Sequence, residues 1–207
     1  MKKTILITLV LCMLFSFTAC SEQSPSEVTK EALAALKSQD AEAFNALYAG
    51  EPLDFTPTAE NNEEPQILTG ERFTAVMEKL LGFDYEIGKE TITDDSATVE
   101  ITITTYDFGQ TLESAASEVM SQVLELTLSG TSEKEINLLV EEALLNAFDQ
   151  LLEKAKTTTA NVNLTKSKGG WSIDNITENQ ELADALTGGA YSVIMNMSDI
   201  FSGIMTE

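Results

Sequence analysis

Histidine is absent from all 207 residues of the chain. Its absence removes the commonest general base of enzymes and the commonest transition-metal ligand. Cysteine occurs only twice, as Cys12 and Cys20, so the rest of the chain offers no thiolate. A zinc or copper site would have to be built from carboxylates, which suit those metals poorly. The sequence therefore predicts no metal site and no cofactor.

Basic residues are also scarce, with 12 lysines and arginines against 34 aspartates and glutamates. This balance argues against a nucleic-acid partner, because nucleic-acid-binding surfaces are basic. It also disfavours a protein that lies flat on anionic lipid. Solubility alone is one explanation of the acidity, and an acidic functional surface is the alternative.

The first twenty residues have the pattern of a leader. Lys2 and Lys3 precede an apolar run over residues 5–17, and Ala19 stands directly before Cys20. A positive start, a short apolar core and a small residue at the cleavage site are typical of a secretory signal peptide at 1–19. The run is shorter than the roughly 20 residues of a membrane-spanning helix. An N-terminal anchor that is never cleaved is the alternative.

The tetrapeptide Phe17-Thr18-Ala19-Cys20 resembles the bacterial lipobox, although leucine is usual where this chain has Phe17. The resemblance implies cleavage between Ala19 and Cys20 and a diacylglycerol thioether on Cys20. Two acyl chains suffice for stable anchoring. We therefore expect a lipid-anchored protein on the extracytoplasmic face of the cell membrane. Without the leader the chain would carry no internal disulfide and a formal net charge of −24.

Helical and strand periodicities alternate along the first half of the chain after Cys20. The strand patterns alternate apolar with polar residues, and Gly88 interrupts the first of them as a bulge would. The expected elements, in order, are a polar tether at 20–25, helices at 26–48 (broken at 38–41) and 71–81, and strands at 83–92 and 97–105.

Two amphipathic helices are predicted within an insertion at 111–156. Gly130 ends the first, and the capping-box sequence Ser132-Glu133-Lys134-Glu135 begins the second. The short link predicts an antiparallel helical hairpin. Its apolar faces are expected to pack on each other and on the sheet. A groove that binds a partner protein is the alternative.

Strand patterns return at 160–164 and 171–173, on either side of a glycine-containing turn. Trp171 alternates with Ile173, which predicts a core side chain, and stacking on a ligand is the alternative. Helices are expected at 178–187 and 191–205. These C-terminal helices, within residues 178–207, are expected to pack on the domain.

The chain resembles bacterial lipoproteins with a cystatin-like fold of the nuclear-transport-factor-two type. The resemblance lies in the order of three elements: the helix at 26–48, the strand Ala97–Thr104 and the hairpin Leu164–Asp174. The resemblance covers 26–177. It implies an α+β domain with N-terminal helices on a curved antiparallel sheet that encloses a conical pocket. The insertion at 111–156 departs from the minimal fold and would fill or cover this pocket. The residues expected to line the pocket are Phe73, Tyr85, Ile101, Ile103 and Trp171.

Enzymes of this superfamily often use a histidine–aspartate pair or a tyrosine with an acidic base in the pocket. A histidine–aspartate pair is impossible here because the chain has no histidine. A tyrosine with an acidic base could be imitated by Tyr85, Tyr106, Asp84 and Asp107. However, Tyr106 and Asp107 are adjacent and would point to opposite faces of a strand. The sequence therefore predicts a non-catalytic, membrane-anchored binding or assembly module for a small ligand or an envelope protein. The alternatives are an enzyme that uses a tyrosine and a carboxylate, and a structural partner in an envelope complex.

Overall fold

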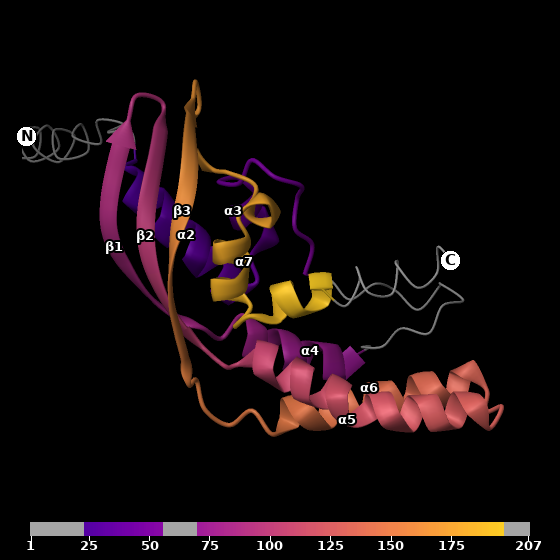
Figure 1. Ribbon diagram of the computed structural model, residues 1–207. Helices are drawn as coiled ribbons and strands as arrows, with labels where there is room; N and C mark the ends of the chain where they lie inside the picture. The colour runs from indigo at the N-terminus through magenta and orange to yellow at the C-terminus, as the bar shows by residue number, and fades with distance from the viewer. Residues whose placement is uncertain (1–22, 56–69, 197–207) are drawn as a thin grey trace, which may run out of the picture.

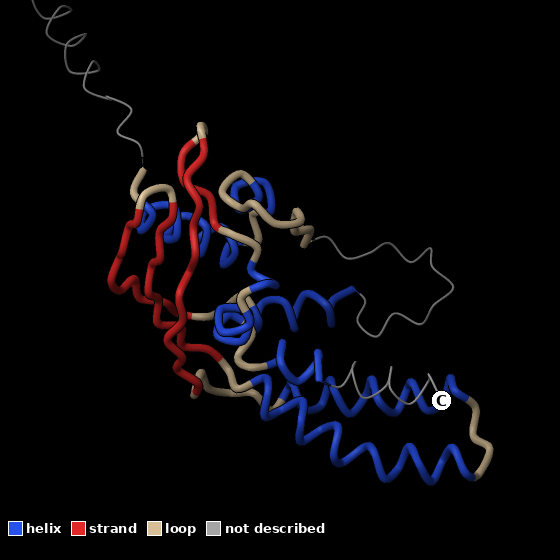
Figure 2. Tube along the Cα trace, turned by 45° about the horizontal axis from the view of Figure 1, so that its top comes forward, coloured by secondary structure: helices blue, strands red, loops and turns tan. Residues whose placement is uncertain are grey.

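The computed structural model describes residues 23–55 and 70–196, and the expected lipidation site at Cys20 lies outside this part (Figure 1). The described residues form an α+β fold. Four antiparallel strands follow each other in the sheet in the order β1-β2-β3-β4. Helices cover one face of the sheet, and a pair of long helices extends from its end, as Figure 2 shows from a second direction.

The first helix, α2 (Pro25–Ser38), begins earlier than the sequence pattern predicted. Ser24 caps it, because the Ser24 hydroxyl accepts a hydrogen bond from the Glu27 amide and the Glu27 carboxylate accepts one from the Ser24 amide. Pro25 is therefore not the end of a tether but the first residue of the helix, where its fixed φ is favourable. The predicted break is confirmed, since Gln39 has a φ of 57°. The short helix α3 (Ala41–Asn45) follows.

Strands β1 (Asp84–Thr93) and β2 (Ser96–Thr105) form the predicted hairpin. The register shifts between Ile87 and Glu90, which places the expected bulge at Gly88. In β2 buried and less buried side chains alternate, and Val99, Ile101 and Ile103 are fully buried. Such alternation is what a strand with one face on the core requires.

Strand β3 (Lys156–Ser167) is longer than predicted and turns back into β4 (Gly170–Ile173). Its additional residues pair with the end of β2, where Lys156 lies opposite Thr105. Gly170, in the turn, has a φ of 112°, which glycine adopts readily. The helix expected at 178–187 is divided into a 3₁₀ turn, η1 (Ile176–Glu178), and α7 (Gln180–Leu186).

The inner face of the sheet is packed with side chains from α2, α3 and α7, including those of Val28, Phe44 and Leu182. Ile101 and Ile103 belong to this core rather than to the lining of an open cone. Trp171 is 8% exposed and Ile173 is 3% exposed, so the expectation that Trp171 is a core side chain is confirmed. The core fills the place where the resemblance implied a conical pocket.

The helical hairpin is inserted between β2 and β3, as predicted, and consists of α5 (Phe108–Leu128) and α6 (Glu133–Asp149). It begins before residue 111 because the Asp107 carboxylate accepts a hydrogen bond from the Gln110 amide and caps the first turn. Helix α6 ends at Asp149 instead of continuing to residue 155.

The two long helices contact each other, but they do not cover the sheet, and this part of the prediction is wrong. The sheet face is occupied by α2 and α7, so the hairpin projects from the end of the sheet (Figures 1 and 2). Helix α4 (Gly70–Leu80) lies beside the base of the hairpin. None of the described helices is both long enough and apolar enough to cross a membrane.

The helix expected at 191–205 is seen in part, since residues 190–196 are helical and the rest lies outside the described residues. Val193 is 9% exposed and packs inward, whereas the Ile194 and Met195 side chains are about half exposed.

Candidate functional site

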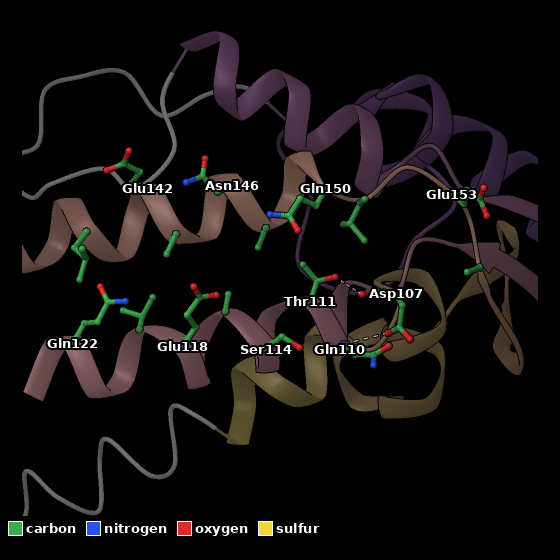
Figure 3. A pocket seen from close by; sticks show the side chains of 17 residues that line it. Asp107, Gln110, Thr111, Ser114, Glu118, Gln122, Glu142, Asn146, Gln150 and Glu153 are labelled. Carbon is green, nitrogen blue, oxygen red and sulfur yellow. Dashed lines mark hydrogen bonds between the residues drawn. The ribbon is translucent and has the colours of Figure 1, made fainter.

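A groove runs along the hairpin between α5 and α6 and has a volume of about 600 Å³ (Figure 3). Side chains from the two helices face each other across it, and Asp107 and Glu153 lie at its base. Its apolar side chains are Ala115, Val119, Leu139, Ala143, Ala147, Leu151 and Ala155. Its polar side chains are Asp107, Gln110, Thr111, Ser114, Glu118, Gln122, Glu142, Asn146, Gln150 and Glu153.

Short side chains make the floor of this groove. Ala115 and Val119 on α5 are buried, at 6% and 7% exposure, and Ala143 and Ala147 line the groove from α6. Because alanine reaches little beyond its helix backbone, the longer glutamine and glutamate side chains stand above the floor as walls. The groove therefore offers an apolar floor between polar walls.

The charge of the groove has one sign. Among the described residues that line it, four are carboxylates and none is a lysine or an arginine. Asp107 is paired with Lys156, whose Nζ lies 3.0 Å from Asp107 Oδ1, whereas Glu142 and Glu153 are exposed. The whole hairpin from Phe108 to Asp149 contains eight acidic residues and a single lysine, Lys134. A ligand in the groove would thus meet negative potential from the lining and from the rest of the hairpin.

A second hollow, of about 470 Å³, lies on the other side of α6, between α6 and α4. It is lined mainly by apolar side chains, among them Val76, Leu138 and Phe148, and it shares Glu142 and Asn146 with the first groove. Helix α6 therefore forms one wall of both cavities.

Three lysines attach the base of the hairpin to the body. Lys79 on α4 donates hydrogen bonds to the Phe148 and Leu151 carbonyl oxygens, at 2.7 and 3.1 Å. These carbonyls belong to the last turn of α6 and to the residues just after it, and a cation is favourable at that end of a helix. Lys79 thus binds carbonyl oxygens at the point where α6 ends, at Asp149.

The other two lysines lie where the chain returns to the sheet. Lys154 Nζ is 2.7 Å from Asp84 Oδ2, and Lys156 is bound to Asp107. The hydrogen bond from Lys154, with a further contribution from Lys37, holds the pKa of Asp84 below its usual value. The base of the hairpin is thus tied to β1, to α4 and to its own first turn.

Large apolar side chains are exposed along the projecting part. Met120 is 58% exposed, Leu138 54% and Leu128, at the tip, 81%. Leu152, just after α6, is 83% exposed. Single exposed apolar residues are ordinary, but several on one projecting element are typical of an interaction surface.

Of the residues predicted to line a pocket, Tyr85, Ile101, Ile103 and Trp171 line neither of these cavities. The Tyr85 hydroxyl donates a hydrogen bond to the Lys30 carbonyl oxygen at 3.3 Å, and Phe73 lies in α4 with its side chain outside the described part. The Tyr106 ring packs against Phe108 with centroids 5.8 Å apart. Within the described residues, neither tyrosine hydroxyl is hydrogen-bonded to Asp84 or Asp107, and both of these carboxylates are paired with lysines. The non-catalytic reading stays a prediction.

Sequence reasoning identified the hairpin but assigned the site to the sheet. The signal for the groove was present in the acidic residues and alanines that share the facing sides of α5 and α6. Alanines at helical spacing also fit ordinary helix packing, and the periodicity alone does not distinguish the two cases.

No protein-family model and no curated protein matches the chain. Among solved structures, a crystal structure from Bacillus subtilis, provisionally described as a lipoprotein, aligns with a TM-score of 0.36 and 16% identity. The alignment covers 56% of this chain and 37% of the other, so the match spans little more than a third of that protein. Similarity at this level supports no conclusion about function, and the cystatin-like superfamily remains an expectation from the sequence.

Proposed function

We propose that this protein is a lipid-anchored, extracytoplasmic binding module, and that the α5–α6 hairpin is its binding element. The lipid would be carried by Cys20, as the lipobox-like sequence implies. The sheet and its covering helices would serve as a rigid support. The partner would be another protein of the cell envelope.

The observation that carries this proposal is the placement of the hairpin relative to the start of the described chain. Helix α2 begins beside the β1–β2 turn, where the Ser26 amide donates a hydrogen bond to Glu90 Oε2 at 2.8 Å. The hairpin leaves the opposite end of β2, after Thr105 (Figure 1). A ten-residue strand spans about 33 Å, so the two ends are well separated.

A lipid on Cys20 would attach only a few residues before α2 and would hold the β1–β2 turn near the membrane. The hairpin would then extend away from the membrane, since α5 alone, with 21 residues, is about 30 Å long. Its acidic surface is suited to this position, because anionic lipid headgroups would repel it. A membrane-bound protein that carries exposed apolar side chains at its distal end is arranged to meet a partner there.

Photo-crosslinking in the producing cells tests the proposal. A photoreactive phenylalanine analogue would replace Leu138 on the hairpin or, as the matched control, Ile92 near the β1–β2 turn. The two positions are 54% and 51% exposed, so they differ in place rather than in accessibility. We expect a discrete crosslinked species from position 138 and a much weaker one from position 92. Equal crosslinking from both positions, or crosslinking from position 92 alone, would contradict the proposal.

A further inference from the structure

We propose that the groove between α5 and α6 takes a cationic amphipathic helix of the partner protein. This inference rests on the proposed function and specifies the partner of the same hairpin.

The groove has the length and the lining that a short helix needs. Its lining extends from Gln110 to Gln122 on α5 and, along α6, from Leu139 to the C-cap residue Gln150. At 1.5 Å per residue, these stretches are about 17–18 Å long, which equals roughly three turns of a helix lying alongside. The alanine floor allows close approach, and amphipathic helices bind such grooves through their apolar stripe.

Charge decides which kind of helix fits. The exposed carboxylates of Glu142, on a wall of the groove, and of Glu153, at its base, would face residues flanking the apolar stripe of a bound helix. Lysine or arginine at those flanking positions would be attracted, and glutamate or aspartate would be repelled. Basic side chains also bring long apolar stems, which can pack over the apolar floor.

The groove could also be occupied by the hairpin of a second copy of this chain, but the negative charge of the hairpin argues against that occupant. Two hairpins brought together would combine eight acidic residues and one lysine from each. Such like-charge contacts oppose association. The hairpin of another copy therefore fits the groove less well than a basic helix does.

The test uses the full-length lipidated protein in phosphatidylcholine nanodiscs, with empty nanodiscs as the blank. The probe is a synthetic 14-residue amphipathic peptide with leucines on one face and lysines on the others. A peptide with glutamate in place of every lysine, and one with the lysine and leucine order rearranged, serve as controls. Affinity is measured by fluorescence anisotropy at low and high salt.

The variants compare equal losses of charge on the same hairpin. Glu142→Gln with Glu153→Gln removes two exposed carboxylates that line the groove. Glu113→Gln with Glu125→Gln removes two exposed carboxylates of α5 that do not line the groove. Glutamine keeps the size of each side chain, and circular dichroism verifies that each variant is folded.

We expect the lysine peptide to bind at least about tenfold more tightly than the other two peptides, and to lose affinity as salt is raised. The groove variant should weaken binding about tenfold and the control variant less than about threefold. Equal binding of the lysine and glutamate peptides, or equal effects of the two variants, would overturn the inference. If the peptide test fails but position 138 still crosslinks to a partner, the proposed function stands and only this inference is rejected. If position 138 does not crosslink, the proposed function itself is rejected.

Discussion

Two buried threonines should respond to the same substitution with opposite signs. Thr29 and Thr105 are 0% and 1% exposed. The Thr29 hydroxyl donates a hydrogen bond to the Pro25 carbonyl oxygen at 2.8 Å. Within the described part of the chain, the Thr105 hydroxyl has no hydrogen-bond partner. Replacement of each by valine removes the hydroxyl and keeps the branched shape.

The magnitudes follow from what each hydroxyl does. A buried hydrogen bond contributes about 0.5–1.5 kcal/mol, so Thr29→Val should lower the free energy of unfolding by about 1 kcal/mol. A buried hydroxyl without a partner costs about 1–3 kcal/mol relative to an apolar group in mutational data. Thr105→Val should therefore raise the free energy of unfolding by about 1 kcal/mol or more.

Urea denaturation followed by circular dichroism measures both changes on the same protein. The slope of the free energy with urea should stay constant, so that the midpoint reports stability directly. A loss of stability in Thr105→Val would refute the reasoning, because it would mean that the hydroxyl is satisfied in the folded protein. Equal losses in the two variants would refute it as well.

Three further predictions concern the base of the hairpin and the core. Lys79→Met should speed hydrogen exchange of the α6 amides and lower the free energy of unfolding by about 1–2 kcal/mol, because the Phe148 and Leu151 carbonyls lose a charged donor. The control Lys134→Met, at an exposed position, should change neither quantity much. Equal effects of the two variants would contradict this prediction. Trp171→Ala should lower the free energy of unfolding by about 3–5 kcal/mol in urea titrations, and an unchanged midpoint would remove Trp171 from the core. Asp84→Asn should lower stability by less than about 1 kcal/mol at neutral pH, since this carboxylate is exposed. The pKa of Asp84 is lowered on folding, so its contribution is present above the unfolded value near 4 and is lost as the pH falls through the lower folded value. A stability gap between variant and wild type that widens as the pH falls below 4 would contradict the assignment.

The strands show where sequence patterns suffice. In β2 the alternation of Val99, Ile101 and Ile103 with polar residues fixes one buried face, and the structure buries all three. The bulge at Gly88 and the break before α3 were likewise visible as local interruptions of a pattern. Such features depend on neighbours in the chain, so local periodicity predicts them.

The ends of two helices differ from the prediction, one for a local reason and one because a residue far along the chain is involved. Helix α2 begins at Pro25 through the Ser24–Glu27 capping box, whereas the prediction placed Pro25 in the polar tether. Helix α6 ends at Asp149, where Lys79, some 70 residues earlier, binds the terminal carbonyls. Leu151 and Leu152 continue the apolar pattern, but the chain leaves the helix before reaching them.

The candidate site was missed for a related reason. A conical pocket was expected from the resemblance, but α2 and α7 fill the inner face of the sheet. The groove depends on how α5 and α6 lie against each other, and on the hairpin projecting from the sheet instead of covering it. Alternation and helical spacing identify which faces are apolar, but they do not identify the element that covers each face.

The direction of the hairpin relative to the membrane is the claim on which the proposed function depends. A single cysteine introduced at Leu128 or at Ile92 would carry a fluorophore on the lipidated protein in vesicles with a nitroxide quencher on the lipid headgroups. The Cys20→Ala protein, which the lipobox reading predicts to be unanchored, serves as the control and should show no quenching at either position. We predict strong quenching at position 92 and little at position 128. Stronger quenching at position 128 would place the hairpin on the membrane and contradict the account.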